Sequence, residues 1–140
     1  MPTRIAEATW QGTLKEGSGS VKLGSGAYEG PFSYVSRFET GSGTNPEELL
    51  GAAEAGCFTM ALNLRLFQNG FTPNHIHTTA HVQMDKTEAG NTIVNIHLVV
   101  EGSVPGISAE DFAVHAAETS KGCIISRAIS APITVAAKLV

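Results

Sequence analysis

The sequence predicts an α+β protein whose strands pair mostly in antiparallel fashion. Glycine- and serine-rich turns separate short alternating runs in residues 5–44, which is the spacing of β-hairpins. A long apolar helical stretch follows in residues 45–70. Two alternating strands, one or two helices and a last strand complete the order. At 140 residues the chain has a single-domain length, so we expect one domain, residues 1–140.

The amino-terminal region is expected to contribute three strands. Ser20–Leu23 and Phe32–Phe38 alternate polar and apolar side chains and are interpreted as strands. The glycines around them complete neither a dinucleotide-binding nor a P-loop pattern. They are therefore interpreted as turn residues, and no nucleotide is implied.

A strong helix start lies at Asn45, which can cap the helix, with Pro46 suited to the first helical position. The two acidic residues that follow favour the positive end of the helix dipole, and Gly70 can end the helix. Residues 49–64 are apolar on most faces, which predicts burial on most faces. One small sheet covers one side of a helix, so the other side is left for a partner chain.

The second half of the chain predicts a hairpin, helices and a strand. His75–Asp85 alternates cleanly, as a half-buried strand does. The next strand is expected to turn one apolar face inward, formed by Val94, Ile96, Leu98 and Val100. Ser108 can cap a helix with Asp111 at its third position. Residues 123–129 predict a short helix and Pro132–Val140 a last strand.

Charge and hydropathy exclude several classes of function. Nine basic and thirteen acidic residues give a net charge of -4, too acidic for the phosphate-neutralising face of a nucleic-acid-binding protein. A polybasic membrane anchor is not expected either. The apolar helix is shorter than the roughly 20 residues that span a bilayer. The first residues lack the apolar region of a signal peptide, so we expect a cytoplasmic protein.

Two cysteines, Cys57 and Cys123, are too few for a disulfide framework or a zinc ribbon. On composition alone they are two buried small hydrophobic residues. Cys57 lies too deep in the long helix for the dipole to lower its pKa, so a cation would have to do so. Cys123 follows Gly122 at a probable helix start, where free N–H groups favour a thiolate. Either sulfur is therefore a candidate nucleophile.

Several runs of the chain, in order, resemble the OsmC/Ohr family of peroxidases, and its osmotically inducible OsmC branch more than its organic-hydroperoxide-resistance branch. These runs are Ser36–Glu39, Gly43–Ala53, Cys57–Leu62, Gly70–Pro73 and Val104–Ile107. The resemblance extends from about Trp10 to the end of the chain. It implies an OsmC-like fold, in which mostly antiparallel sheets wrap around a long buried central helix in an intertwined homodimer.

The resemblance also implies an activity, the two-cysteine reduction of organic hydroperoxides and of hydrogen peroxide in defence against oxidative stress. Cys57 matches the peroxidatic cysteine and Cys123 the resolving cysteine. Arg37 matches the arginine that lowers the thiolate pKa and orients the peroxide, and Glu47 matches the glutamate that holds this arginine. Proline often follows the family's resolving cysteine, whereas Ile124 follows it here. No metal, haem or flavin is implied, and the reductant would be an external dithiol of the lipoyl type.

Helix geometry adds an expectation about how the site is assembled. Glu47 and Cys57 are about 15 Å apart along one helix at ~1.5 Å per residue. That is too far for Glu47 to brace an arginine that touches Cys57 of the same chain. Two such helices packed antiparallel would bring each glutamate near the other chain's cysteine. We therefore expect a shared site, with both cysteines from one chain and Glu47 and Arg37 from the other.

Each of these residues also has a simpler interpretation. Glu47 could be a first-turn dipole partner only, and Arg37 a solvated residue of an alternating strand. Glu54, one turn before Cys57, could act as a local base or raise the thiol pKa. A solvated or interface position is the commoner place for such a glutamate, and we expect it here.

The histidines and the activity itself leave alternatives open. His75, His77 and His81 share a strand face that His97 can join across the hairpin, so a surface metal site is stereochemically possible. The polar face of an amphipathic strand is the favoured interpretation. For the whole chain, the alternatives to a peroxidase are a redox-responsive or small-molecule-binding module that senses oxidant without turnover, and a structural dimer with inert thiols.

Overall fold

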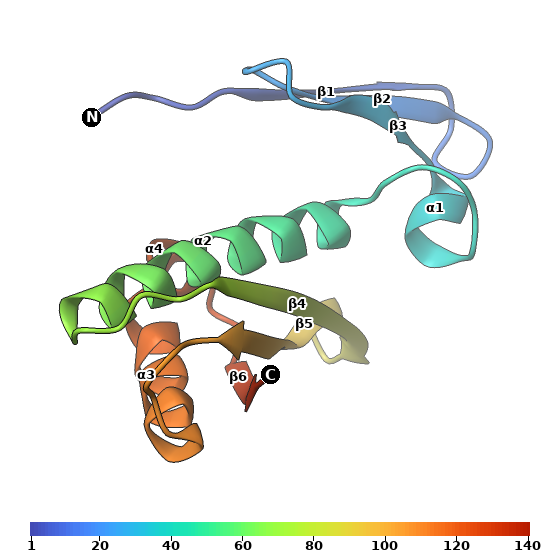
Figure 1. Cartoon of the computed structure of the whole chain (residues 1–140). Helices are drawn as coiled ribbons and strands as arrows, with labels where there is room; N and C mark the ends of the chain where they lie inside the picture. Colours follow the sequence, from blue (N-terminus) through green and yellow to red (C-terminus); the bar gives the residue numbers. More distant parts are fainter. The chain divides into compact units, whose positions relative to one another are not determined.

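The computed structural model describes all of residues 1–140. Its contacts divide the chain into two compact units, Met1–Leu49 and Leu50–Val140, and each is described by itself. Figure 1 labels the elements in order: β1 Ala6–Gln11, β2 Ser18–Leu23, β3 Glu29–Phe32, α1 Tyr34–Phe38, α2 Pro46–Gln68, β4 His75–Thr87, β5 Gly90–Ser103, α3 Ala109–Gly122, α4 Ile124–Ala128 and β6 Ile133–Leu139. The predicted α+β class is confirmed.

The first unit holds a three-stranded antiparallel sheet in the order β1-β2-β3, as the turn spacing predicts. The expectation of a strand over Phe32–Phe38 is wrong, because β3 ends at Phe32 and Tyr34–Phe38 form α1. Ser33 and Ser36 decide this through a capping box. The Ser36 N–H donates to Ser33 Oγ at 3.1 Å, and the Ser33 N–H donates to Ser36 Oγ at 2.8 Å. Two backbone donors are thereby satisfied at the helix start.

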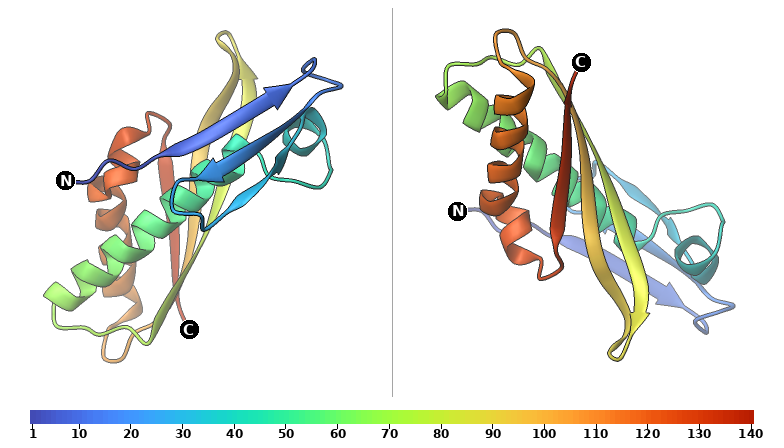
Figure 2. Two further views of the ribbon diagram at one scale, coloured as in Figure 1. Left: turned by 90° about the horizontal axis from the view of Figure 1, so that it is seen from above. Right: turned by 90° about the horizontal axis from the view of Figure 1, so that it is seen from below.

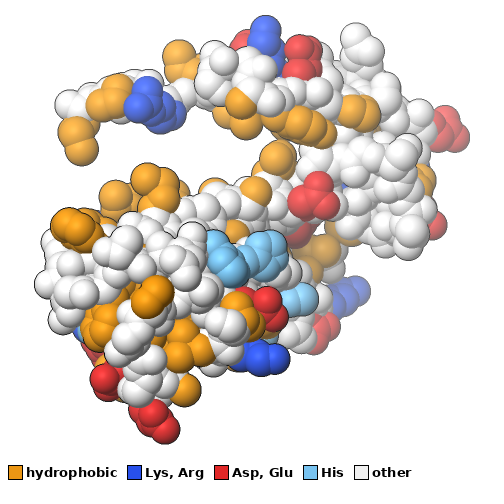
Figure 3. All heavy atoms as spheres, in the orientation of Figure 1, with side chains coloured by type: hydrophobic (Ala, Val, Ile, Leu, Met, Phe, Trp, Pro, Cys, Tyr) orange, Lys and Arg blue, Asp and Glu red, His pale blue; other side chains and the backbone are white.

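Helix α2 begins and ends as its signals predict. Asn45 Oδ1 accepts the Glu48 N–H at 2.7 Å, and Gly70 follows the helix with φ +89°. Within the single chain α2 leaves one face open, because the apolar stripe Met60, Leu64 and Phe67 is 76%, 56% and 67% exposed. Hydrophobic side chains accordingly gather at the surface along α2 (Figure 3). The buried residues form the other face: Gly51, Glu54, Phe58, Leu62 and Leu66.

The second unit holds a sheet in the order β4-β5-β6 (Figure 2). The β4–β5 hairpin is antiparallel, as predicted, and β6 pairs with β5 in parallel. One expected side-chain direction is wrong. Asn95 pairs with Gln83 but Ile93 pairs with Met84, so an irregularity leaves Val94 unpaired. Such a bulge shifts the alternation by one residue, and Ile93 instead of Val94 packs against the core.

Helices α2 and α3 cover the same face of this sheet. A Cβ on Gly51 of α2 would lie 3.1 Å from the Val82 side chain, and one on Gly102 of β5 would lie 2.6 Å from the Phe112 ring of α3. Val82 and Gly102 are on the same face of the sheet, because Val82 pairs with Ile96 and successive even-numbered residues of β5 point the same way. The core between these layers consists of Phe58, Leu62, Leu66, Ile96, Leu98, Val100, Val104, Phe112 and Ala116.

The two last helices are joined at a single residue. Ser108 caps α3, as predicted, by accepting the Asp111 N–H at 3.1 Å. Cys123 ends α3, where its N–H donates to the Thr119 carbonyl at 3.1 Å, and it is also the N-cap of α4. The chain therefore changes direction at the second cysteine. No helix of the structure is both long enough and apolar enough to cross a membrane.

Candidate active site

The two cysteines meet in the second unit. Cys57 lies in the middle of α2 and is half-buried, whereas Cys123 is buried between α3 and α4. Both are free thiols, and their Sγ atoms are 2.6 Å apart although 66 residues separate them in sequence. The two sulfurs are therefore within reach of each other for a disulfide.

A backbone N–H at the start of α4 points to Cys57 and not to Cys123, the residue that precedes this helix. The Ile125 N–H donates to Cys57 Sγ at 3.5 Å, while the Cys123 side chain makes no capping bond. Burial raises the pKa of the Cys57 thiol above its ordinary value of 9.0, the neighbouring Cys123 raises it further, and the Ile125 N–H lowers it. The free N–H group that the sequence assigns to Cys123 thus donates to the other sulfur, that of Cys57.

Glu54 is the buried acid of the site. The expected solvated or interface position is wrong, because its side chain is 0% exposed. Its Oε1 accepts a hydrogen bond from the hydroxyl of Ser126 in α4, and its Oε2 has no partner. The helix turns this carboxyl inward because residue 54 lies on the same face as Phe58 and Leu62. Glu54 therefore joins α2 to the short helix that follows the second cysteine.

Ser126 and the Ile125 amide are the parts of this site that sequence reasoning missed. Ser126 lies three residues after Cys123, inside an otherwise apolar start of α4. A lone acid in an apolar helix needs a buried partner. This requirement is the sequence signal that Glu54 has a buried hydrogen-bond partner, but it does not say which hydroxyl of the chain is that partner.

Arg37 and Glu47 form an ion pair in the first unit. Arg37 Nε donates to Glu47 Oε1 at 3.1 Å and to Oε2 at 3.3 Å, and Nη2 donates to Oε1 at 2.8 Å. The side chains are 39% and 15% exposed. Because Arg37 belongs to α1 and not to a strand, its position depends on how that helix is held. A guanidinium held through two of its nitrogens has a fixed orientation.

Two hydrogen bonds hold α1 against the residues just before α2. The hydroxyl of Ser36, which is 6% exposed, donates to the Thr44 carbonyl at 2.7 Å. The Asn45 side-chain amide donates to the Ser36 carbonyl at 3.0 Å. Thr44 is itself tied to β3, since its N–H donates to the Pro31 carbonyl at 2.9 Å. Asn45 therefore both caps α2 and fixes α1, which sets Arg37 opposite Glu47.

An apolar hollow of about 410 Å³ borders Arg37 in the same unit. Its side-chain walls come from β1, β3, α1 and the turn after β1: Trp10, Leu14, Phe32, Tyr34, Arg37 and Phe38. The rings of Trp10 and Phe32 lie 5.2 Å apart across Gly19, where a Cβ would meet both rings within 2.6 Å. Arg37 is the only charged residue of the lining. The hollow can take an apolar group beside a guanidinium.

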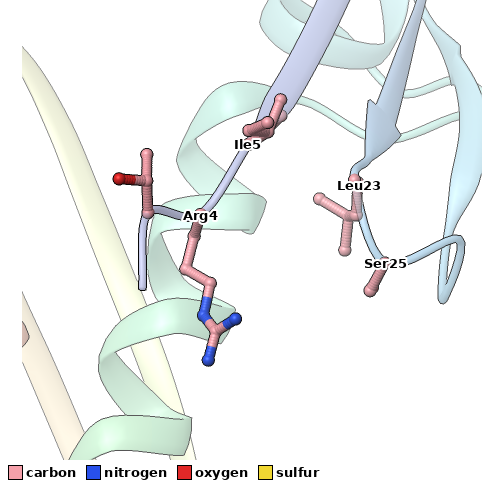
Figure 4. Close-up of a pocket in the computed structure, with 7 residues that line it drawn as sticks. Arg4, Ile5, Leu23 and Ser25 are labelled. Atoms are coloured by element: carbon pink, nitrogen blue, oxygen red, sulfur yellow. The ribbon is translucent and has the colours of Figure 1, made fainter. Parts of the chain in front are cut away.

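A second hollow, of about 530 Å³, lies between the residues before β1 and the turn after β2 (Figure 4). Thr3–Ala6 form one wall and Leu23–Ser25 the other. The Gly24 N–H donates to the Ile5 carbonyl at 2.8 Å and ties the walls together. Arg4 is its only charged residue, and it contains none of the residues that the sequence analysis selected.

The histidines gather on the surface of the second unit (Figure 3). His81 pairs with His97 across the hairpin, as predicted, and their ring centres are 6.4 Å apart. Nδ1 of His97 lies 2.7 Å from the Thr134 hydroxyl. No three histidine, cysteine or acidic side chains come together as a metal site would require.

Comparison with known proteins gives a consistent picture. A protein-family model described as OsmC-like protein matches residues 39–138. The Peroxiredoxin OsmC of Escherichia coli K12 is 46% identical over 130 residues, which cover 92% of this chain and 91% of that protein. The Shigella flexneri protein of the same name matches equally well.

Solved structures share the fold. An OsmC-like protein of unknown function from Vibrio cholerae superposes with a TM-score of 0.78 at 14% identity, over 99% of this chain and 100% of that one. The organic hydroperoxide resistance protein OhrB of Bacillus subtilis gives 0.71 at 23% identity, over 97% and 98% of the two chains.

Proposed function

The chain belongs to the OsmC-like protein family, and on that premise we propose that it is a thiol-dependent peroxidase that uses two cysteines to reduce organic hydroperoxides. One observation carries the proposal. The sulfurs of Cys57 and Cys123 are 2.6 Å apart although the residues are remote in sequence. Two free thiols at this distance supply what a two-cysteine cycle needs, a nucleophile and a second thiol within reach of it.

Cys57 is the peroxidatic residue of this cycle, because its sulfur is the less buried one and accepts the Ile125 N–H. Its thiolate attacks the O–O bond and takes one oxygen, which leaves a sulfenic acid on Cys57 and releases the remainder as an alcohol, or as water from hydrogen peroxide. The Cys123 thiol then attacks the sulfenic sulfur, a disulfide forms and water leaves. The peroxide is reduced by two electrons, and the two thiols are oxidised by two.

Arg37 orients the peroxide and favours the thiolate, and Glu47 fixes the guanidinium. Their three hydrogen bonds of 2.8 to 3.3 Å support these roles. The apolar hollow beside Arg37 supports an organic substrate, because an alkyl group can enter it while the peroxide oxygens meet the cation. Hydrogen peroxide lacks that group and would be the poorer substrate.

An external dithiol of the lipoyl type completes the cycle by reducing the disulfide. A dithiol suits this step because its second sulfur closes a ring and releases the protein from the mixed disulfide. We place the protein in the cytoplasm, where reduced thiols persist between turnovers.

The working unit is a homodimer in which each site takes both cysteines from one chain and Arg37 and Glu47 from the other. Glu47 and Cys57 belong to one continuous helix, α2, and are about 15 Å apart along it. The exposed stripe Met60, Leu64 and Phe67 repeats at helical spacing and supports burial against a second copy of α2.

The activity is tested by peroxide consumption with a dithiol donor. The wild-type chain should turn over tert-butyl or cumene hydroperoxide faster than hydrogen peroxide. Cys57→Ser should remove turnover completely, whereas Cys123→Ser should complete one oxidation and then accumulate sulfenic acid. Thiols that oxidise without turnover would indicate a sensor instead, and thiols that stay unreactive a structural dimer.

Site sharing is tested by mixing inactive chains. A heterodimer of a Cys57→Ser chain with a Glu47→Ala chain should regain about one competent site, because each chain supplies what the other lacks. The matched control mixes Cys57→Ser with Cys123→Ser, and it should stay inactive because both cysteines must come from one chain. No recovery in the first mixture would show that each chain builds its own site.

A further inference from the structure

Glu54 makes a contact that the proposed cycle does not use. It lies on α2 one turn before Cys57, and its only partner, Ser126, lies in α4 three residues after Cys123. One hydrogen bond therefore connects the helix that carries the first sulfur with the helix that follows the second.

We propose that Glu54 is a positioning residue which, by accepting the Ser126 hydroxyl, holds α4 and with it Cys123 against Cys57, so that the sulfenic acid closes to the disulfide before a second peroxide reaches it. This inference rests on the proposed function. It adds a determinant of the resolving step, the ratio of disulfide formation to further oxidation. Further oxidation of a sulfenic acid gives a sulfinic acid, which dithiols do not reduce.

The cost of the contact supports a functional role. Glu54 is fully buried and its Oε2 has no hydrogen-bond partner. A buried polar atom without a partner destabilises a fold, so an apolar residue of similar size would suit this core position better. The carboxyl therefore serves some end other than stability, and the helix that it holds begins directly after the resolving thiol.

The remaining contacts of α4 explain why this one matters. The helix has five residues, and its other contacts with Cys57 are backbone N–H groups, that of Ile125 at 3.5 Å from the sulfur and that of Ile124. Cys123 makes no capping bond that would fix the start of α4. Oxidation of Cys57 changes the acceptor of these N–H groups, but it changes neither partner of the bond between Glu54 and Ser126. This bond therefore holds α4 in place during the interval in which Cys123 must attack.

The test compares four variants with wild type. Ser126→Ala removes the donor, and Glu54→Leu removes the acceptor while filling the core. Glu54→Gln keeps an oxygen that can accept the hydroxyl. Ser103→Ala is the matched control, because its exposed hydroxyl accepts the Asn74 amide away from the cysteines. The readout is the fraction of Cys57 carried to sulfinic acid per turnover, measured by mass spectrometry, alongside the rate of the first oxidation.

We expect Ser126→Ala and Glu54→Leu to raise the sulfinic acid per turnover about tenfold, the population change that loss of one hydrogen bond to a carboxyl group produces. The first oxidation should keep its wild-type rate. Glu54→Gln and Ser103→Ala should match wild type in both readouts. Wild-type overoxidation in both Ser126→Ala and Glu54→Leu would overturn the proposal. So would a Glu54→Gln chain as sensitive as Glu54→Leu, because the charge and not the hydrogen bond would then matter.

A measurement without peroxide separates this inference from the proposed function. In a glutathione redox buffer, the equilibrium constant for closing the disulfide between Cys57 and Cys123 should fall about tenfold in Ser126→Ala. An unchanged constant would overturn the inference even where the wild-type chain is an active peroxidase. A reduced constant in a chain that consumes no peroxide would leave the contact supported and the proposed function wrong.

Discussion

Replacing Arg37 by methionine tests whether its guanidinium acts on the Cys57 sulfur. Burial raises the pKa of Cys57 above its ordinary value of 9.0. At pH 7, a thiol in that state is thiolate in fewer than about one molecule in a hundred. A cation within about 4 to 6 Å lowers such a pKa by about 1 to 3, which increases the thiolate about 10- to 1,000-fold. Arg37→Met should remove this increase while it keeps an unbranched side chain at the position.

The assay is the rate of alkylation by iodoacetamide as a function of pH, in a Cys123→Ser background where only Cys57 reacts. Only the thiolate reacts, so the rate rises with pH and levels off above the pKa. In the Arg37-containing protein the midpoint should lie below that of the Arg37→Met protein. In Arg37→Met it should move upward, toward the value above 9.0 that burial sets. Arg37→Lys keeps the charge and should stay near the Arg37 curve.

Lys22→Met is the control, because it removes an exposed positive charge from β2 of the same unit. It should leave the midpoint unchanged. Coincident curves for Arg37 and Arg37→Met would refute the reasoning, since a guanidinium that leaves the thiol pKa unchanged cannot lie beside the sulfur. An equal shift in Lys22→Met would also refute it, because the effect would then come from net charge.

Three further predictions follow from single contacts. Glu47→Gln should lower kcat/KM for an organic hydroperoxide about tenfold, because the Arg37 guanidinium loses its charge-assisted hydrogen bonds. The loss is moderate because the pair is partly exposed. Unchanged kinetics would show that the pair does not orient Arg37. Phe58→Ala should cost about 3–5 kcal/mol in the free energy of urea unfolding because its ring is fully buried, whereas Met60→Ala should mainly promote dissociation of the proposed dimer on dilution. Equal unfolding costs would contradict the assignment of the two faces. Gly102→Ala should lower thermal stability, by about 1–3 kcal/mol, because its Cβ would lie 2.6 Å from the Phe112 ring; a wild-type melting temperature would contradict that contact.

The elements with complete local signals were predicted well. The cap, proline and acidic first turn of α2 are adjacent in sequence, and the hairpin of β4 and β5 follows from alternation interrupted by one turn. Where two local signals competed, the expectation failed. Residues 32–38 alternate like a strand, but Ser33 and Ser36 form a capping box that starts α1. The serine spacing is visible in the sequence, and the capping box that it forms outweighs the alternation.

The bulge at Val94 belongs to a different kind of failure. Alternation predicts which residues of a strand share a face, but a bulge depends on the partner strand and its register. Nothing in Ile93 and Val94 themselves distinguishes the residue that packs inward. The pairing of Gln83 with Asn95 and of Met84 with Ile93 decides it.

The site shows the same boundary between local and non-local information. The resemblance supplied the two cysteines, Arg37 and Glu47, but not the acid that α2 turns into the core. Glu54 was expected in solvent because isolated glutamates rarely lie buried, yet every neighbour on its helix face is apolar or glycine. Exposing Glu54 would require exposing Phe58 and Leu62, which costs far more than burying one carboxyl that has a hydroxyl partner. The packing of α2 thus forces the acid inward, and Ser126 is where its hydrogen bond can be made. Packing buries Glu54 at a cost to stability, and its carboxyl then contacts the helix beside the resolving thiol. Resolution of the sulfenic acid can therefore be tuned at this residue without altering either sulfur.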